Sequence, residues 1–69
     1  MLTNNEKKQI INSELRELHR QKYQLELACK VLKNTGQEGQ LESRTNILIK
    51  TEEMIDQYNA ELKELNAET

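Results

Sequence analysis

The segment INSELRELHRQKYQLELACKVL, residues 11–32, contains seven mostly apolar positions that follow one another at alternating intervals of four and three residues. We call this set of positions a stripe. This spacing marks one face of an α-helix, because seven residues make about two helical turns. A β-strand would instead alternate at every second residue. The stripe consists of Ile11, Leu15, Leu18, Lys22, Leu25, Cys29 and Leu32, so a single lysine interrupts its apolar run. We therefore predict a helix that packs one face against another helix.

A second stripe with the same period runs through the C-terminal half of the chain. Its members are Leu41, Arg44, Leu48, Thr51, Ile55, Tyr58, Leu62 and Leu65. Both glycines lie between the stripes, and Gly36 suits the left-handed conformation that ends many helices. We expect residues 1–69 to form a single helical-hairpin domain, with helices at about 3–34 and 40–67 and a loop at about 34–40. One straight helix through both glycines is the alternative, but it would leave both stripes unpaired unless several chains assembled.

The length of the chain makes self-association the expected source of stability. Chains of 69 residues rarely bury enough apolar surface to be stable alone, and small proteins often add disulfides, metals or oligomerisation. One cysteine, Cys29, excludes an intrachain disulfide, and one histidine, His19, offers no cluster of metal ligands. The predicted fold is therefore all-α: an antiparallel, coiled-coil-like two-helix hairpin that dimerises into a four-helix bundle.

The charges divide unevenly between the two halves of the chain. Residues 1–34 carry seven Lys and Arg against four Glu, whereas residues 35–69 carry three against eight acidic residues. A basic helix beside an acidic one suits an antiparallel pair. In a hairpin folded about the glycines, residues whose numbers add to about 75 face each other, which places Lys22 near Glu52 and Glu53.

Further side chains lie off the main stripes and predict additional packed surface. In the first helix a second line contains Arg16, Arg20, Tyr23, Leu27 and Val31, and in the second helix Ile47 and Met54 widen the stripe. We predict that the apolar members, Leu27, Val31, Ile47 and Met54, form an oligomer interface. Arg and Tyr are enriched where proteins bind one another, so Arg16, Arg20 and Tyr23 are the predicted patch for a partner or ligand.

Several classes of function are disfavoured by what the chain lacks. It has no glycine-rich phosphate loop and no Ser/His/Asp or Cys/His set, so we expect no enzymatic activity, no cofactor and no metal. The longest aliphatic run, Ile47 to Ile49, is far short of a membrane span, and nucleic-acid binding is disfavoured by the net charge of −2. A single cysteine and no export signal at the start indicate the cytoplasm.

The expected function is a small cytosolic protein–protein interaction module, an adaptor or inhibitor, that acts through helix faces of an oligomeric bundle. The alternative is an oligomer that binds or sequesters a small anionic ligand, such as a nucleotide, where arginines of several subunits meet. A composition rich in Asn, Lys and Glu is compatible with an accessory protein of a bacteriophage or of its bacterial host.

Overall fold

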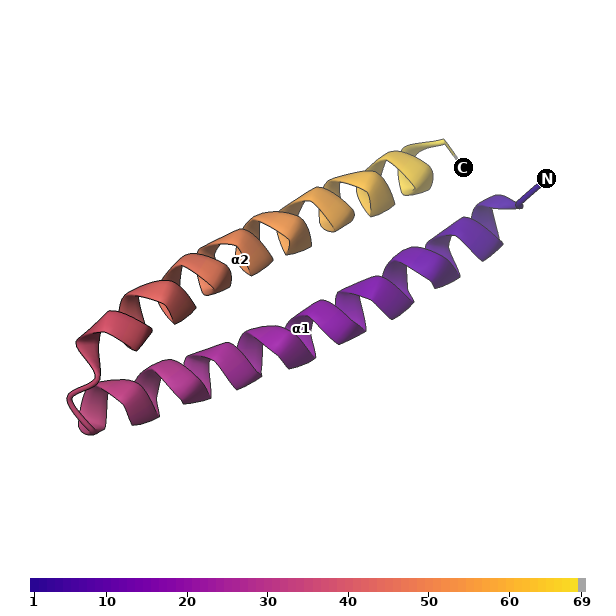
Figure 1. The fold of residues 1–69 in the computed structure, drawn as a ribbon. Helices are drawn as coiled ribbons and strands as arrows, with labels where there is room; N and C mark the ends of the chain where they lie inside the picture. The colour runs from indigo at the N-terminus through magenta and orange to yellow at the C-terminus, as the bar shows by residue number, and fades with distance from the viewer. Residues whose placement is uncertain (69) are drawn as a thin grey trace.

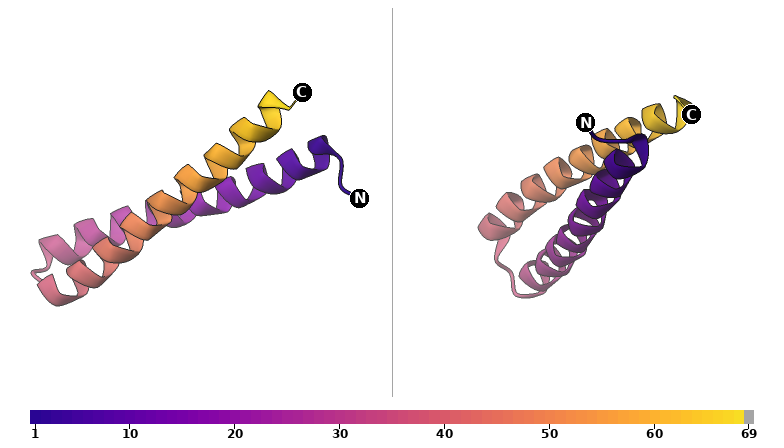
Figure 2. Two further views of the ribbon diagram at one scale, coloured as in Figure 1. Left: turned by 90° about the horizontal axis from the view of Figure 1, so that it is seen from above. Right: turned by 90° about the vertical axis from the view of Figure 1, so that its right-hand side faces the viewer.

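A computed structural model of the chain describes residues 1–68, which form two long antiparallel helices (Figure 1). Helix α1 is Asn4–Asn34 and helix α2 is Glu38–Ala67, and the described residues contain no strand. The Cα atoms extend over 50 × 16 × 14 Å, and both termini lie at the end opposite the loop (Figure 1). Viewed from above, the helices cross rather than run strictly parallel (Figure 2). The predicted all-α hairpin is confirmed.

Local hydrogen bonds define both ends of α1. At its start the Glu6 backbone N–H donates to Thr3 Oγ1 at 3.1 Å, and the Thr3 backbone N–H donates to Glu6 Oε1 at 3.3 Å. This reciprocal capping box satisfies amides that the first turn of a helix leaves unpaired. At its end the backbone N–H groups of Gly36 and Gln37 donate to the carbonyls of Lys33 and Leu32. Because this Schellman arrangement needs a left-handed residue, Gly36 adopts φ +74°.

Only the first of the two glycines breaks the helical path. Gly39 lies inside α2, which begins at Glu38, two residues before the expected start. An acidic side chain in the first turn favours this start, because the N-terminal end of a helix carries partial positive charge. The connection between the helices is therefore only residues 35–37.

The core between the helices is narrow, and it is built from the two predicted stripes. Leu15, Leu18 and Ile55 form its centre, with Ile11, Tyr58 and Leu62 packed against them. Leu25 and Thr51 are also buried, and the Thr51 hydroxyl donates to the Ile47 carbonyl at 2.8 Å. Every stripe position is buried or half-buried except Arg44, which is exposed. No large side chain of residues 1–68 is fully buried, so the hairpin supplies little core of its own.

The predicted proximity of Lys22 to Glu52 and Glu53 does not produce an ion pair within residues 1–68. Cys29 Sγ lies 3.8 Å from Thr45 Oγ1 across the interface, a register in which facing residue numbers add to about 74. Lys22 is half-buried but makes no ion pair with either glutamate within residues 1–68. Thr51 occupies the buried position at this height, whereas Glu52 and Glu53 are exposed.

Candidate functional site

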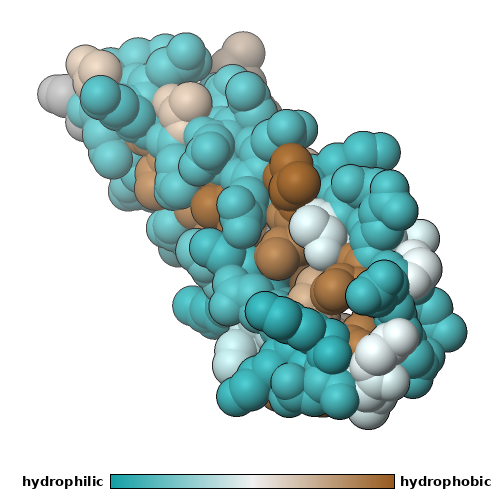
Figure 3. Space-filling model, turned by 90° about the vertical axis from the view of Figure 1, so that its left-hand side faces the viewer, coloured by the Kyte–Doolittle hydropathy of each residue, from teal (hydrophilic) through white to brown (hydrophobic). Residues whose placement is uncertain are grey.

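Seven large apolar side chains of residues 1–68 are between 47% and 52% exposed, and five of the six that belong to helices lie along one side of the hairpin. We call this set the apolar face; its members are Ile10, Leu27, Val31, Ile47 and Met54. Isolated apolar residues are normal on a protein surface, but several apolar residues that gather on one side of two helices are typical of an interaction surface. A space-filling view from the loop end shows a row of exposed apolar groups between polar ones (Figure 3).

The seven-residue period explains why most of these side chains lie along one side. In α1, Ile10 and Val31 belong to a row of positions 10, 17, 24 and 31, and in α2, Ile47 and Met54 belong to a row of positions 40, 47, 54, 61 and 68. Residues seven apart are about two turns apart, so each row follows one flank of its helix. Side chains from both helices line the same grooves, which places the two rows on the same side.

Near the loop, the apolar face forms a groove of about 390 Å³. Leu27 and Val31 line it from α1, and Arg44 lines it from α2. An adjoining hollow is lined by Arg44 and Ile47. Three of the four residues predicted for the oligomer interface therefore come together at this end. The fourth, Met54, lies seven residues further along α2, in a hollow that it shares with Lys50, Glu53, Gln57 and Tyr58.

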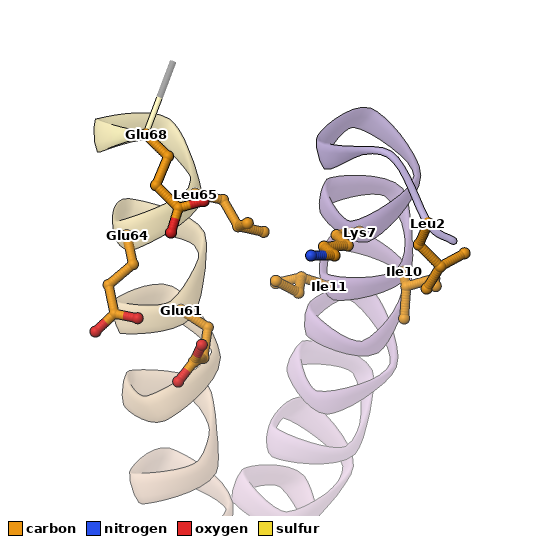
Figure 4. A pocket seen from close by; sticks show the side chains of 8 residues that line it. All are labelled: Leu2, Lys7, Ile10, Ile11, Glu61, Glu64, Leu65 and Glu68. Atoms are coloured by element: carbon orange, nitrogen blue, oxygen red, sulfur yellow. The ribbon is translucent and has the colours of Figure 1, made fainter.

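At the open end of the hairpin, where both termini lie, a hollow of about 410 Å³ is lined by side chains of different charge from those of the groove near the loop. Ile11 and Leu65 point toward each other between the helices (Figure 4). The charged side chains that line this hollow are Lys7, Glu61, Glu64 and Glu68. Arg44, by contrast, is the one charged residue that lines the groove near the loop. The apolar face is thus acidic at one end and basic at the other.

Two residues that line these hollows, Ile10 and Arg44, were not predicted from the sequence to belong to an interaction surface. Ile10 stands beside the stripe residue Ile11, and the hollow at the open end places it with the three glutamates. Arg44 occupies a stripe position, yet it is exposed and lines the groove. Ile10 lies 21 residues, or three seven-residue periods, before Val31, and this spacing was the signal that could have identified Ile10.

The predicted patch of Arg16, Arg20 and Tyr23 is exposed on α1, with Tyr23 65% exposed. Arg20 is bound to Glu17 through two hydrogen bonds, Nη2 to Oε1 at 2.6 Å and Nε to Oε2 at 3.1 Å. These hydrogen bonds hold the pKa of Glu17 below its ordinary value and raise the pKa of Arg20. Glu17 therefore orients the guanidinium and neutralises its charge within one hairpin.

The remaining sequence predictions concern metal binding, membrane insertion, Cys29 and an anionic ligand. The described part of the chain holds no group of three or more His, Cys, Asp or Glu side chains arranged for a metal ion. None of its helices is long and apolar enough to cross a membrane. Cys29 is half-buried and free. The anionic ligand at subunit interfaces stays a prediction.

Comparison of the chain with protein-family models, with curated proteins and with solved structures finds no match.

Proposed function

We propose that this protein is a small protein–protein interaction module that self-associates into a four-helix bundle and binds a protein partner through α1. The observation that carries the proposal is the apolar face: five half-exposed apolar side chains on a hairpin whose residues 1–68 include four buried apolar residues. Burial of a large aliphatic side chain is worth about 1.5–3 kcal/mol. Because these side chains are already about half buried, covering the apolar face recovers about half of that value for each of them.

The partner patch rests on Arg16, Arg20 and Tyr23. They are exposed, and Arg20 is held in one orientation by Glu17. Arginine and tyrosine contribute strongly to binding when they are desolvated, and a pre-oriented side chain loses less conformational freedom on binding. A homodimer that covers the apolar face leaves Arg16 and Tyr23 free for a different protein.

The test compares patch variants of the tagged full-length chain. We expect Arg16→Ala and Tyr23→Ala to retain wild-type helicity and oligomer mass but to lose at least about tenfold in affinity for the captured protein, as hot-spot residues do. Lys63→Ala, at an exposed position of α2, is the matched control and should bind normally. Normal binding by both patch variants would contradict the proposed patch.

The proposal places this module in the cytoplasm, as an accessory protein of a bacteriophage or a bacterium. It is supported by the single cysteine and by the Asn-, Lys- and Glu-rich composition.

A further inference from the structure

The apolar face carries glutamates at its open end and Arg44 near the loop. These opposite charges favour a second copy of the chain as the binding partner and favour one orientation of that copy. We propose that a second copy of the chain stacks on the apolar face in the antiparallel sense, with its loop over the open end of the first. This inference rests on the proposed self-association and adds the arrangement of the two copies. Its main polar contact is Arg44 of one protomer with Glu64 of the partner subunit.

The size of the surface suits a second hairpin. One long side of the hairpin spans 50 Å by 16 Å between Cα extremes, and a second hairpin of the same dimensions can cover its whole length. A second copy has the same length and presents the same face, so a two-fold axis can cover all five apolar residues of both copies.

The positions of Met54, Ile10, Leu27 and Val31 fit an axis that crosses the hairpin near Met54. Met54 lies near the middle of α2, so it would meet its own copy. On α1 the axis passes near residue 20, because facing residue numbers add to about 74. Ile10 then lies opposite the part of the partner's α1 that carries Leu27 and Val31.

The charges fit the same axis. Arg44 precedes Met54 by ten residues and Glu64 follows it by ten. A two-fold axis at Met54 therefore places Arg44 of one copy at the same position along the hairpin as Glu64 of the partner subunit. Within residues 1–68 neither side chain has an ion-pair partner in its own hairpin. Glu61 and Glu68 line the same hollow as Glu64 and add to its negative potential. The two-fold axis would form the Arg44–Glu64 contact twice.

Parallel stacking is less favourable electrostatically. It would bring the loop ends together and join Leu27 and Val31 to the Ile47 region of the other copy. It would also gather six glutamates at one end and both Arg44 side chains at the other. Like charges close together at an interface lower affinity and disfavour that register.

The first experiment tests the charged contact by sedimentation equilibrium. Arg44→Glu and Glu64→Arg should each weaken dimerisation by at least about tenfold, because each single change sets like charges opposite each other twice. The double variant should dimerise more tightly than Arg44→Glu alone. Arg16→Glu, which changes an exposed arginine off the apolar face, is the control for altered net charge and should dimerise as wild type. Unchanged affinity in both single variants, or no recovery in the double variant, would overturn the contact.

The second experiment measures orientation directly. A nitroxide attached to Gln37→Cys, in a Cys29→Ser background, reports the distance between the two loops by pulsed electron paramagnetic resonance. Antiparallel stacking predicts a separation near the 50 Å length of the hairpin, and parallel stacking predicts one near its 14–16 Å thickness. A short distance in a dimer would overturn the orientation but leave self-association intact. A wild-type monomer would overturn both the orientation and the proposed bundle.

Discussion

At the scale of single residues, the clearest electrostatic feature is the pair formed by Arg20 and Glu17. Both side chains are largely exposed, so the pair orients the guanidinium more than it stabilises the fold. Arg20 lowers the pKa of Glu17 in the folded hairpin. The stabilisation that this provides is present above the ordinary glutamate pKa of 4.5 and is lost as the pH falls through the lowered value.

We predict that Arg20→Ala raises the pKa of Glu17 toward its ordinary value, because the hydrogen bonds to the guanidinium disappear. Carboxyl-carbon NMR titration of Glu17 measures this change directly. Lys30→Ala, an exposed change further along α1, serves as the control and should leave the Glu17 titration unaltered. A Glu17 pKa that is the same with and without Arg20 would contradict the pairing.

At the scale of the elements, the two glycines have different roles despite lying three residues apart. Gly36 has φ +74°, a conformation in which a side chain is strained, whereas Gly39 is helical with open space where a Cβ would lie. We predict that Gly36→Ala lowers the free energy of unfolding by about 1–2 kcal/mol. Gly39→Ala should instead raise it by up to about 1 kcal/mol.

Urea denaturation of both variants at one protein concentration measures these changes. The two substitutions add the same methyl group, so each is the control for the other. Equal effects of the two alanines, in either direction, would contradict the assignment of the turn to Gly36.

The helices were predictable because their signals are local and repeated. The intervals of three and four residues in the two stripes identified the buried faces, and Gly36 identified the turn. The start of α2 was less predictable, since Gly39 is compatible with a loop and with a helix. The contact expected at Lys22 rested on height along the hairpin alone, whereas Thr51 is the stripe position there and Glu52 and Glu53, off the stripe, are exposed.

Most of the apolar face was predictable from the sequence, but the charged residues at its two ends were not. Leu27, Val31, Ile47 and Met54 stand out as apolar residues off the stripes, and all four are about half exposed in the hairpin. Arg44 and the three glutamates at the open end do not stand out, because charged residues are common throughout the chain. Their placement at opposite ends of one side follows from the fold of the two helices.

At the scale of the whole molecule, the hairpin is long and thin, and its core is a single seam. Residues 20–53, the half near the loop, carry six Lys and Arg against five acidic residues, and the other half carries four against seven. The charge asymmetry of the apolar face is therefore shared by the whole hairpin. Inverting a second copy brings the acidic half of each molecule over the more basic half of the other.

The most direct test of the account is the mass of the purified full-length protein in solution. Sedimentation equilibrium over a range of concentrations should give twice the chain mass of 8.1 kDa for the wild type. Ile47→Glu, which buries a charge at the interface, should shift the equilibrium toward monomer. A wild-type mass of 8.1 kDa at the highest soluble concentration, with circular dichroism that shows full helicity, would contradict the claim that a second copy covers the apolar face.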